Sequence, residues 1–489
     1  MLFNSHIFML LFLPLLLAGW YFLNWKKKFQ LAQGYLIGMS LWFYAYANLQ
    51  YLWLLLFSCL IGWLLSCVPE KISSEKGKKV LTGVGCVFHL GLLGYFKYSN
   101  FFLENLNTVF HTDFPMLQIL LPVGISFYTF QQLAYLIDRC RGDAPRDSFF
   151  DYLTFMVYFP QLLQGPILLR SEFMGQLKEP ERRRFHAERF SEGIQFFVFG
   201  LAKKVLLADT LAKAVNYGYS NVSMLDSISA LLLAVGYLTE LYFDFSGYCD
   251  MAVGLGKMIG LEVAENFDAP FHSASVKEFW RRWHMTLGRF FTRYVYIPLG
   301  GNRRGKMRTL CNVMIVMLLS GLWHGAAWTF VLWGFLHGVG MIWDNLEHPH
   351  LPKKWMRQAA TFAYVCMTFV FFRAESIAQG VDVLKSIVSL KWNGFVFQMA
   401  SALDMTECYI ITKALSMKLP GLLSWFWLGI FVVLIAICFR VLSGEKVSGV
   451  VALKRQKGYG RLYPVLLAVL FTWSMISMTG VSEYLYFSF

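Results

Sequence analysis

The sequence predicts an all-α protein that crosses a membrane many times. Of its 489 residues, 57% are hydrophobic and only 15% are charged, and the mean hydropathy is +0.48. A soluble domain needs about 45–50% apolar residues. The apolar residues also gather in runs close to the ~20 residues that a helix needs to cross hydrocarbon. Composition and run length together therefore indicate a polytopic membrane protein.

About eleven apolar runs have the length, or nearly the length, of a membrane-spanning helix. They lie near 7–23, 31–47, 51–68, 80–96, 117–137, 227–245, 309–322, 326–343, 359–373, 425–442 and 462–479. A twelfth candidate, 194–216, carries Lys203 and Lys204 in its middle, where each charge costs about 2.5–3.5 kcal/mol on insertion scales. We therefore expect this segment to be tilted, partly re-entrant or beside a wet cavity. The expected architecture is about 11–12 spans with re-entrant and amphipathic helices around a central tunnel.

The basic residues predict the orientation of these spans. Lys26, Lys27 and Lys28 lie two crossings away from the cluster Lys71–Lys79, and therefore on the same face. Further basic stretches keep this parity if 194–216 crosses; they are 170–189, 277–308, 353–357 and 440–461. Short basic loops stay on the cytoplasmic side. Topology and contact with anionic membrane lipids thus explain most of the net charge of +14, and no nucleic-acid partner is expected.

No repeat, proline-rich linker or low-complexity tail divides the chain, so a single domain over 1–489 is predicted. Within it, Pro122, Gly124 and Pro160 interrupt the apolar segment 117–166, which predicts broken helices that line a passage, re-entrant hairpins, or ordinary kinks. The segment 374–424 has apolar residues at helical spacing and predicts an amphipathic surface helix on the outer face. The nine cysteines contain no CxxC pair and are expected to be small core residues rather than metal ligands or disulfides.

Two histidines stand among aromatic, arginine and glycine residues in the segment 277–337. His284 and His324 can each exchange a proton near neutral pH, and polar groups at membrane depth are costly, so they are candidate chemical groups. His337 lies farther along an apolar run and is expected to be structural. Asp244, at the end of another apolar run, is expected to hold an imidazole in one tautomer, to pair with an arginine of 281–293, or merely to clamp a loop.

The basic, aromatic stretch 280–308 has two possible explanations that the sequence does not separate. Its arginines suit the phosphates of coenzyme A because a guanidinium makes bidentate, permanently charged contacts. The positive-inside rule predicts arginines at the same place for any substrate. Gly300, Gly301 and Gly305 favour a turn over a phosphate cradle.

Five motifs occur in order and at close spacing: FDFSGYCDMAVGLGKMIG, NFDAPF, FWRRWHMTL, YVYIPLGGNR and SGLWHGAAWTFVLWGFLHG. They resemble the membrane-bound O-acyltransferase family, and within it the bacterial branch similar to alginate O-acetyltransferases. The likeness covers most of 120–489, so 117–489 is the motif-bearing region, whereas 1–116 are N-terminal helices that match only in hydropathy. The D-alanyl transferase of teichoic acid synthesis shares part of these motifs.

The resemblance implies transfer of an acyl group, most simply acetyl, from a cytoplasmic thioester such as acetyl-coenzyme A. The implied acceptor is a hydroxyl of an exported cell-surface polysaccharide, reached directly or through a separate extracytoplasmic acetyltransferase. No bound cofactor or metal is implied, and the location is the bacterial cytoplasmic membrane. His324 of the WHG motif carries the family's catalytic role, as a base or as an acyl carrier, with His284 across the same cavity. Candidate donor- or substrate-binding residues are Asp244, Arg281, Arg282, Trp283, Arg289 and Trp323.

Two other classes remain possible on the sequence, a transporter and a scaffold for a polysaccharide export complex. A transporter of this size often has two halves with matching interrupted helices, which the chain lacks. Counting spans from the basic loops places 321–325 near a turn on the outer side of the membrane, between two spans. A donor that arrives from the cytoplasm must therefore reach His324 through a tunnel. The sequence does not identify the polysaccharide.

Overall fold

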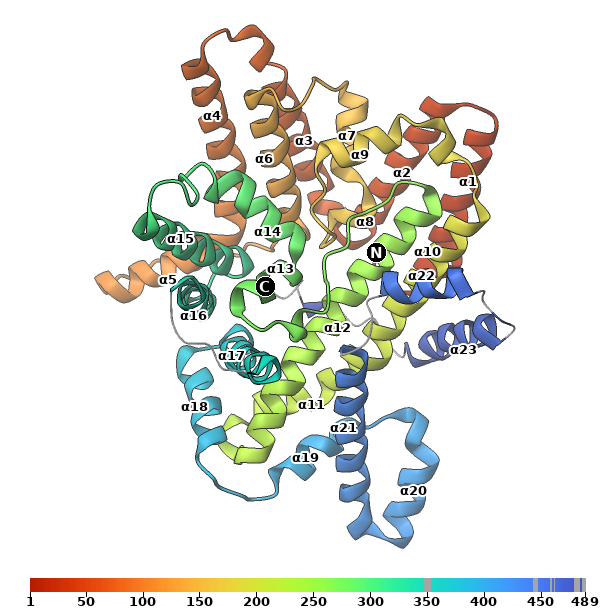
Figure 1. The fold of residues 1–489 in the computed structure, drawn as a ribbon, viewed down its shortest axis with the longest axis vertical. Helices are drawn as coiled ribbons and strands as arrows, with labels where there is room; N and C mark the ends of the chain where they lie inside the picture. The colour runs from red at the N-terminus through yellow and green to blue at the C-terminus, as the bar shows by residue number, and fades with distance from the viewer. Residues whose placement is uncertain (347–352, 443–446, 458–459, 461, 479–483, 486–489) are drawn as a thin grey trace.

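The computed structural model describes residues 1–346, 353–442, 447–457, 460, 462–478 and 484–485. Within these ranges the chain forms helices and no strand, which confirms the all-α prediction. The longest helix, α12 (Ser227–Ile259), crosses the middle of the molecule (Figure 1). It begins where the Asp226 carboxylate accepts a hydrogen bond from the Ser229 backbone and ends at Gly260, whose φ of 81° stops the helix.

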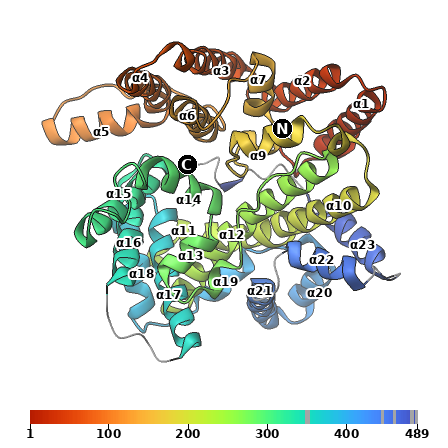
Figure 2. The same cartoon turned by 45° about the horizontal axis from the view of Figure 1, so that its top comes forward.

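The remaining helices surround α12. On the N-terminal side they are α1 (Leu13–Trp25), α2 (Phe29–Asn48), α3 (Leu52–Ser66), α4 (Glu75–Leu93), α5 (Ser99–Phe110), α6 (Ile125–Arg141), α7 (Phe149–Val157), α8 (Phe159–Leu162), α9 (Arg170–Leu177), α10 (Ala187–Ala202) and α11 (Asp209–Ser220). After α12 they are α13 (Val276–Arg282), α14 (Met285–Phe291), α15 (Lys306–His324), α16 (Trp328–Asn345), α17 (Lys354–Arg373), α18 (Ile377–Val388), α19 (Phe395–Ser401), α20 (Tyr409–Lys418), α21 (Pro420–Leu442), α22 (Val447–Lys457) and α23 (Leu462–Ser477). Figure 2 shows α1–α9 on one side of α10 and α12, with α15–α18 and α20–α23 on the other.

Every apolar run expected to span the membrane overlaps a helix. Six helical segments of the described chain are long and apolar enough to cross a membrane, by length and composition: Phe8–Trp25, Leu49–Lys71, Glu75–Phe110, Ser227–Ile259, Lys306–His324 and Pro420–Val441. The protein is thus a multi-pass membrane protein. The larger count of about 11–12 spans stays a prediction for the shorter or more polar helices.

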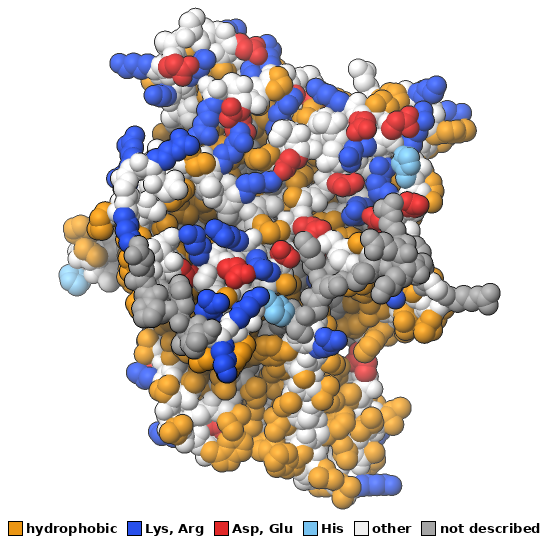
Figure 3. All heavy atoms as spheres, in the orientation of Figure 1, with side chains coloured by type: hydrophobic (Ala, Val, Ile, Leu, Met, Phe, Trp, Pro, Cys, Tyr) orange, Lys and Arg blue, Asp and Glu red, His pale blue; other side chains and the backbone are white. Residues whose placement is uncertain are grey.

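The surface has the asymmetry that the basic loops predicted. Lysine and arginine side chains gather over the part of the view that holds α4, α6, α9 and α13–α15, whereas hydrophobic side chains cover α20 and α21 (Figure 3). On α21 the exposed apolar residues include Leu422, Trp425, Val432 and Val433. Such a band is the surface that lipid tails require.

Backbone contact between α10 and α12 builds the centre of the molecule. A Cβ added to Gly193 would lie 2.6 Å from the Gly254 carbonyl oxygen, and one added to Gly200 would lie 2.5 Å from that of Gly247. The two helices therefore touch through two glycine pairs, which no larger residue permits. Small residues at helix crossings are the usual way in which membrane helices approach closely.

The segment 117–166 is broken, as predicted, but its helix begins later than expected. The run 117–137 is not one helix, because α6 starts only at Ile125, after Pro122 and after Gly124, whose φ is 78°. A Cβ at Gly124 would lie 2.5 Å from the Leu162 carbonyl oxygen, so this turn packs against α8. Pro160 lies at the start of α8.

The amphipathic surface helix expected in 374–424 is α18. Its buried positions are Gly380 and Val383, whereas Ile377 and Val388, which the pattern assigned to the apolar face, are exposed. The helix packs against α12 and α17. Its position on the outer side of the membrane stays a prediction.

Lys203 and Lys204 lie in a π-helical turn, Lys203–Ala208, between α10 and α11. Lys203 Nζ is 2.6 Å from Asp250, and Lys204 Nζ is 2.6 Å from Asp244 and 2.8 Å from Asp209. The π turn points two consecutive lysines at two carboxylates of α12. Each charge at membrane depth thus has an opposite partner, and each lysine also lines a cavity, as expected for this segment.

Candidate functional site

His324 is the last residue of α15 and is 3% exposed. Three aromatic rings surround its imidazole, with centroids 4.9 Å away for Trp323, 5.1 Å for Trp333 and 5.1 Å for Phe372. The helix ends at Gly325, whose extended backbone turns the chain toward α16. The WHG motif therefore places an imidazole at a helix end, inside an aromatic cage.

A lysine from the N-terminal half holds this helix end in place. Lys97 Nζ donates hydrogen bonds to the carbonyl oxygens of Trp323 at 2.7 Å and of His324 at 2.9 Å. The next residue, Tyr98, donates its hydroxyl hydrogen bond to the Leu322 carbonyl at 2.6 Å. These hydrogen bonds are favourable because the last carbonyls of a helix have no partner within the helix. Neither residue belongs to a recognised motif, and the sequence analysis missed both.

His284 lies across from His324, with ring centroids 6.4 Å apart. Its backbone is left-handed, with φ of 47°, at the sharp turn between α13 and α14. The side chain of Asn266, from the NFDAPF motif, meets this turn: its Oδ1 accepts hydrogen bonds from the Thr286 backbone N–H at 3.0 Å and hydroxyl at 3.0 Å, and lies 3.3 Å from His284 Nδ1. Asn266 is a second positioning residue that sequence reasoning did not single out.

The tautomer of His284 follows from these contacts. The Thr286 backbone N–H can only donate, so the Asn266 atom that it meets is the oxygen, and His284 Nδ1 must donate to that same oxygen. Nε2 is then the acceptor nitrogen of a neutral ring. Burial also lowers the pKa of His284 to about 3, because it penalises the charged form. His284 is therefore a neutral imidazole at physiological pH.

A small cavity of about 50 Å³ reaches His324. Its walls are Lys97, Trp323, His324, Leu163 and the broken segment 121–127. The irregular segment thus lines a cavity that reaches the candidate catalytic residue. A continuous tunnel through the molecule stays a prediction.

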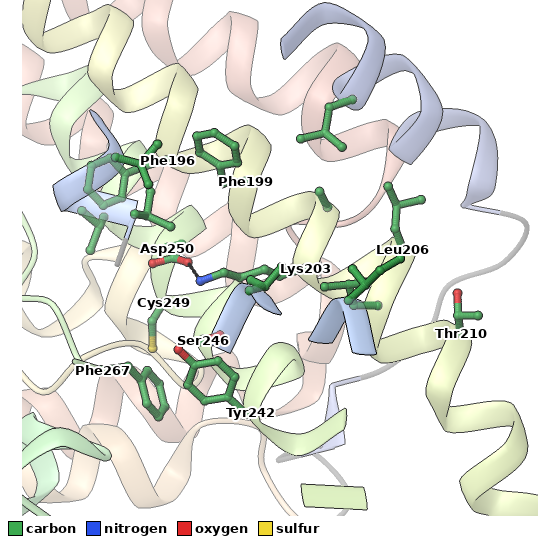
Figure 4. Close-up of a pocket in the computed structure, with 18 of the residues that line it drawn as sticks. Phe196, Phe199, Lys203, Leu206, Thr210, Tyr242, Ser246, Cys249, Asp250 and Phe267 are labelled. Carbon is green, nitrogen blue, oxygen red and sulfur yellow. Dashed lines mark hydrogen bonds and ion pairs between the residues drawn. The ribbon is translucent and has the colours of Figure 1, made fainter. Parts of the chain in front are cut away.

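Two larger cavities flank the central helix. One, of about 530 Å³, is mostly apolar and has the Lys203–Asp250 ion pair on its wall (Figure 4). Asn266 and Phe267 also line it, so it reaches the residue that orients His284. The other, of about 540 Å³, is lined by Lys204, Asp244 and further charged residues, and by Phe372. The imidazole pair thus lies between spaces of different polarity.

The two tryptophans proposed as substrate contacts have different surroundings. Trp323 packs 6.0 Å from His284 and lines the small cavity at His324. Trp283 is 1% exposed and packs against Phe267, Phe279 and Phe369. Trp323 can therefore touch a substrate, whereas Trp283 supports the turn that carries His284.

The expectation that Asp244 holds an imidazole or an arginine of 281–293 is wrong. Its Oδ1 accepts a hydrogen bond from Lys204 Nζ at 2.6 Å, and its Oδ2 accepts one from the Leu485 backbone N–H at 3.1 Å. The carboxylate points to the π-helical turn because a buried lysine there needs an opposite charge. Asp244 instead joins the π-helical turn, α12 and the C-terminal segment.

The three arginines proposed as donor contacts divide by their partners. Arg289 forms a fork with both carboxylate oxygens of Glu172. Arg282 pairs with Glu278 at 2.9 Å, whereas Arg281 is exposed beside it on a surface cavity. Arg281 is therefore the arginine of this set best placed to meet an incoming anion.

The remaining candidates are structural. His337 accepts a hydrogen bond from Trp280 Nε1 at 3.2 Å and lies 2.9 Å from the Thr368 hydroxyl, as expected for a histidine inside a packing seam. Gly300, Gly301 and Gly305 all have positive φ, which supports a turn. Among the described residues, no group of three or more His, Cys, Asp or Glu is placed to hold a metal ion.

A helical membrane protein with two apposed, buried imidazoles beside internal cavities has the form of an enzyme that handles acyl groups inside the bilayer. The family profile described as MBOAT, membrane-bound O-acyltransferase family, matches residues 141–375. That range includes His284, His324, Asn266 and the α10–α12 crossing. The chain belongs to this family and is an acyltransferase.

Curated relatives agree with this assignment. The chain is 35% identical over 423 residues to a peptidoglycan O-acetyltransferase of Helicobacter pylori, and the aligned region covers 80% of each chain. It is 39% identical over 389 residues to a probable alginate O-acetylase of Azotobacter vinelandii, covering 77% of this chain and 76% of the relative. A teichoic acid D-alanyltransferase of Bacillus subtilis is 28% identical over 271 residues, covering 52% of this chain and 69% of the relative.

Proposed function

We propose that the protein transfers an acetyl group from a cytoplasmic thioester, acetyl-coenzyme A, to a hydroxyl of an exported cell-surface polysaccharide. The observation that carries this proposal is His324, an imidazole at a helix end that borders an internal cavity and faces a second, neutral imidazole. The names of the relatives support acetyl as the group and a polysaccharide as the acceptor class. Their occurrence in bacteria supports the cytoplasmic membrane as the location.

The chemistry needs a base at the acceptor hydroxyl. In the direct route, His324 takes the hydroxyl proton while the oxygen attacks the thioester carbonyl, and the proton then passes to the departing thiolate. In the relay route, the His324 ring first takes the acetyl group and releases the thiol, and the acceptor oxygen then attacks the acetylimidazole. In the direct route, a positioned general base contributes about 10²–10⁴-fold. Nε2 of His284, as the acceptor nitrogen of a neutral ring, can hold a hydroxyl or thiol in the same space.

The donor's charged end needs a basic surface. Arg281, Lys277 and Arg282 line a surface cavity that also contains Asp268 and Glu278, and arginine is well suited to bind phosphate. Arg282 pairs with Glu278, and Arg289 pairs with Glu172. These two guanidinium groups are therefore less available to bind phosphate than Arg281 is. We therefore place the phosphates of coenzyme A at Arg281, with the pantetheine arm reaching inward toward Trp323 and His324.

A D-alanyl group is the alternative acyl group, supported by the relatives that act on teichoic acid. These relatives are 28% identical, below the 35% and 39% of the O-acetyl-transferring ones, which favours acetyl. A separate extracytoplasmic acetyltransferase that completes the transfer is compatible with the same site. A transporter or an export scaffold would use no thioester.

The experiment is a thioester-consumption assay with the purified full-length protein in detergent, using acetyl-coenzyme A labelled in the acetyl group. We expect the wild-type protein to consume the thioester when a glycan acceptor is present, and His324→Ala to lose at least about 10²-fold of that rate. His6→Ala is the matched control, because His6 is exposed and its nearest hydrogen-bonding partner is the Met475 carbonyl. A folded His324→Ala protein with more than half of the wild-type rate would contradict the assignment.

A further inference from the structure

The polar cavity of about 540 Å³ lies one aromatic ring away from His324. Phe372 lines the cavity, and its ring centroid is 5.1 Å from that of His324. Ala327, Thr329 and Phe330 also line it, and these residues directly follow the turn after His324. The cavity is therefore next to the candidate catalytic imidazole, on the side of Phe372, and it is distinct from the small cavity at Lys97.

Charged side chains dominate the wall of this cavity. The carboxylates are Asp209, Glu240, Asp244 and Glu375, and the cations are Lys204 and Arg373. Lys204 pairs with Asp209 and Asp244, and Arg373 donates a hydrogen bond to the Asn216 side chain at 3.0 Å. Glu240 is buried and has no cation bonded to it in the described part of the chain, so we count it as neutral; the other three carboxylates and the two cations then leave the lining at minus one. The cavity as a whole is thus acidic.

Glu240 is the group that this network does not satisfy. Its side chain is 2% exposed, it lies on the cavity wall, and its Oε2 has no hydrogen-bond partner among the described residues. Most buried polar atoms in folded proteins have a partner, and a buried carboxylate without one is costly. An unpartnered oxygen on a residue that lines a roomy cavity indicates a hydrogen-bond donor that arrives from outside and meets the carboxyl group once the side chain turns toward the cavity.

We propose that this cavity binds a sugar unit of the acceptor, and that Glu240 accepts a hydrogen bond from one of its hydroxyl groups. The inference rests on the proposed function, because it assigns the acceptor half of the same reaction. A cavity of this volume is within the size range of small-ligand sites. The sugar lies between the charged wall and Phe372, and movement of that ring would bring a hydroxyl to His324.

The acidic wall also defines the class of acceptor. A polyuronate carries one carboxylate per residue, and like charges at short range in a partly buried site repel strongly. A neutral glycan meets no such repulsion and offers hydroxyl donors that match the carboxylate acceptors. The structure therefore assigns a neutral polysaccharide, such as an N-acetylhexosamine polymer, in preference to an anionic one.

The test compares two acceptors of equal length with the purified full-length protein: the neutral tetramer of N-acetylglucosamine and a mannuronate tetramer. We expect a higher kcat/KM for the neutral tetramer. In Glu240→Leu, the KM for the neutral tetramer should rise at least tenfold. Glu240→Gln keeps an acceptor oxygen and should retain most of the affinity. Unchanged KM in Glu240→Leu, or preference for the mannuronate, would overturn the proposal.

A binding measurement separates this inference from the proposed function. The tetramer of N-acetylglucosamine is titrated into His324→Ala protein with and without Glu240→Leu. Binding that weakens tenfold with Glu240→Leu supports the cavity even if the wild-type protein consumes no thioester, and equal binding rejects it even if thioester is consumed. Glu192→Gln is the matched control: Glu192 is also a carboxylate at the α10–α12 contact, but it pairs with Lys257 outside this cavity. It should change neither the binding nor the KM.

Discussion

Lys97 Nζ lies 2.9 Å from the carbonyl oxygen of His324, so a cation from the α4–α5 segment holds the residue that ends α15. The two residues are 227 positions apart in the chain. Lys97 also lines the small cavity that reaches the imidazole. An ammonium has three donors, and two of them are used on the carbonyls of Trp323 and His324. The N-terminal helices thus contribute to the site that the motif-bearing region carries.

Replacing Lys97 with methionine should abolish most acyl transfer while the protein still inserts. Two buried carbonyls would lose their donor, at about 1–3 kcal/mol each, and the end of α15 would be free to shift. A displacement of the reacting group by about 1 Å costs about 10²-fold in rate. The measurement is kcat for thioester consumption, together with thermal unfolding in detergent.

Tyr98→Phe is the control for that variant. It removes only the hydrogen bond to the Leu322 carbonyl, one residue farther from His324, and should lower kcat by less than about tenfold. If Lys97→Met and Tyr98→Phe lower kcat equally, Lys97 has no specific role in holding His324.

The sequence could predict the helical segments and the two histidines because both depend on local pattern. Apolar runs of span length mark helices in lipid wherever the chain folds, and the WHG and FWRRWH motifs are contiguous. Lys97 and Asn266 could not be found in this way, because their roles arise from contacts across the fold. Lys97 lies at the end of an ordinary apolar run. Its role is visible only from its hydrogen bonds to the carbonyl oxygens of Trp323 and His324 at the end of α15.

For Asp244 the sequence left three roles open, namely holding an imidazole, pairing with an arginine of 281–293, or clamping a loop; the structure shows an ion pair of the structural kind, with another partner. A carboxylate at the end of an apolar run needs a cation, but the sequence does not identify which one. The actual cation is Lys204. It lies in the middle of the candidate span 194–216, where a charge is costly. A charged residue inside one apolar segment is therefore best assigned a partner of opposite charge inside another apolar segment, because each is costly without a partner.

Asn266→Leu should reduce acyl transfer by about 10²-fold without loss of folded protein. The side-chain oxygen that binds both donors of Thr286 and His284 Nδ1 would be lost, and the left-handed turn at His284 would no longer be fixed. Asn266→Asp keeps an acceptor oxygen and should recover most of kcat. Steady-state kinetics of the two variants decide the question; equal loss in both would mean that hydrogen bonding to the turn is unimportant.

Lys204→Met should destabilise the protein by about 3–5 kcal/mol, because it leaves the carboxylate of Asp244 buried without its cation. The side chains are 2% and 1% exposed, so the pair is buried. The double variant Lys204→Met with Asp244→Leu removes both charges and should unfold at a higher temperature than Lys204→Met alone. Thermal unfolding in detergent measures the difference, and an equal or lower midpoint in the double variant would contradict it.

Gly254→Val should prevent correct packing of α10 against α12. The new Cβ would lie 2.6 Å from the Gly193 carbonyl oxygen, on a backbone that cannot yield as a side chain could. Overpacking typically costs about 1–3 kcal/mol, and a clash with backbone falls at the upper end of that range. Gly91→Val in α4 is the matched control, because a Cβ there meets nothing within 4 Å. We expect Gly254→Val to lower the yield of monodisperse protein in detergent several-fold and Gly91→Val to leave it unchanged; similar yields would mean that the glycine contact does not hold the centre of the fold.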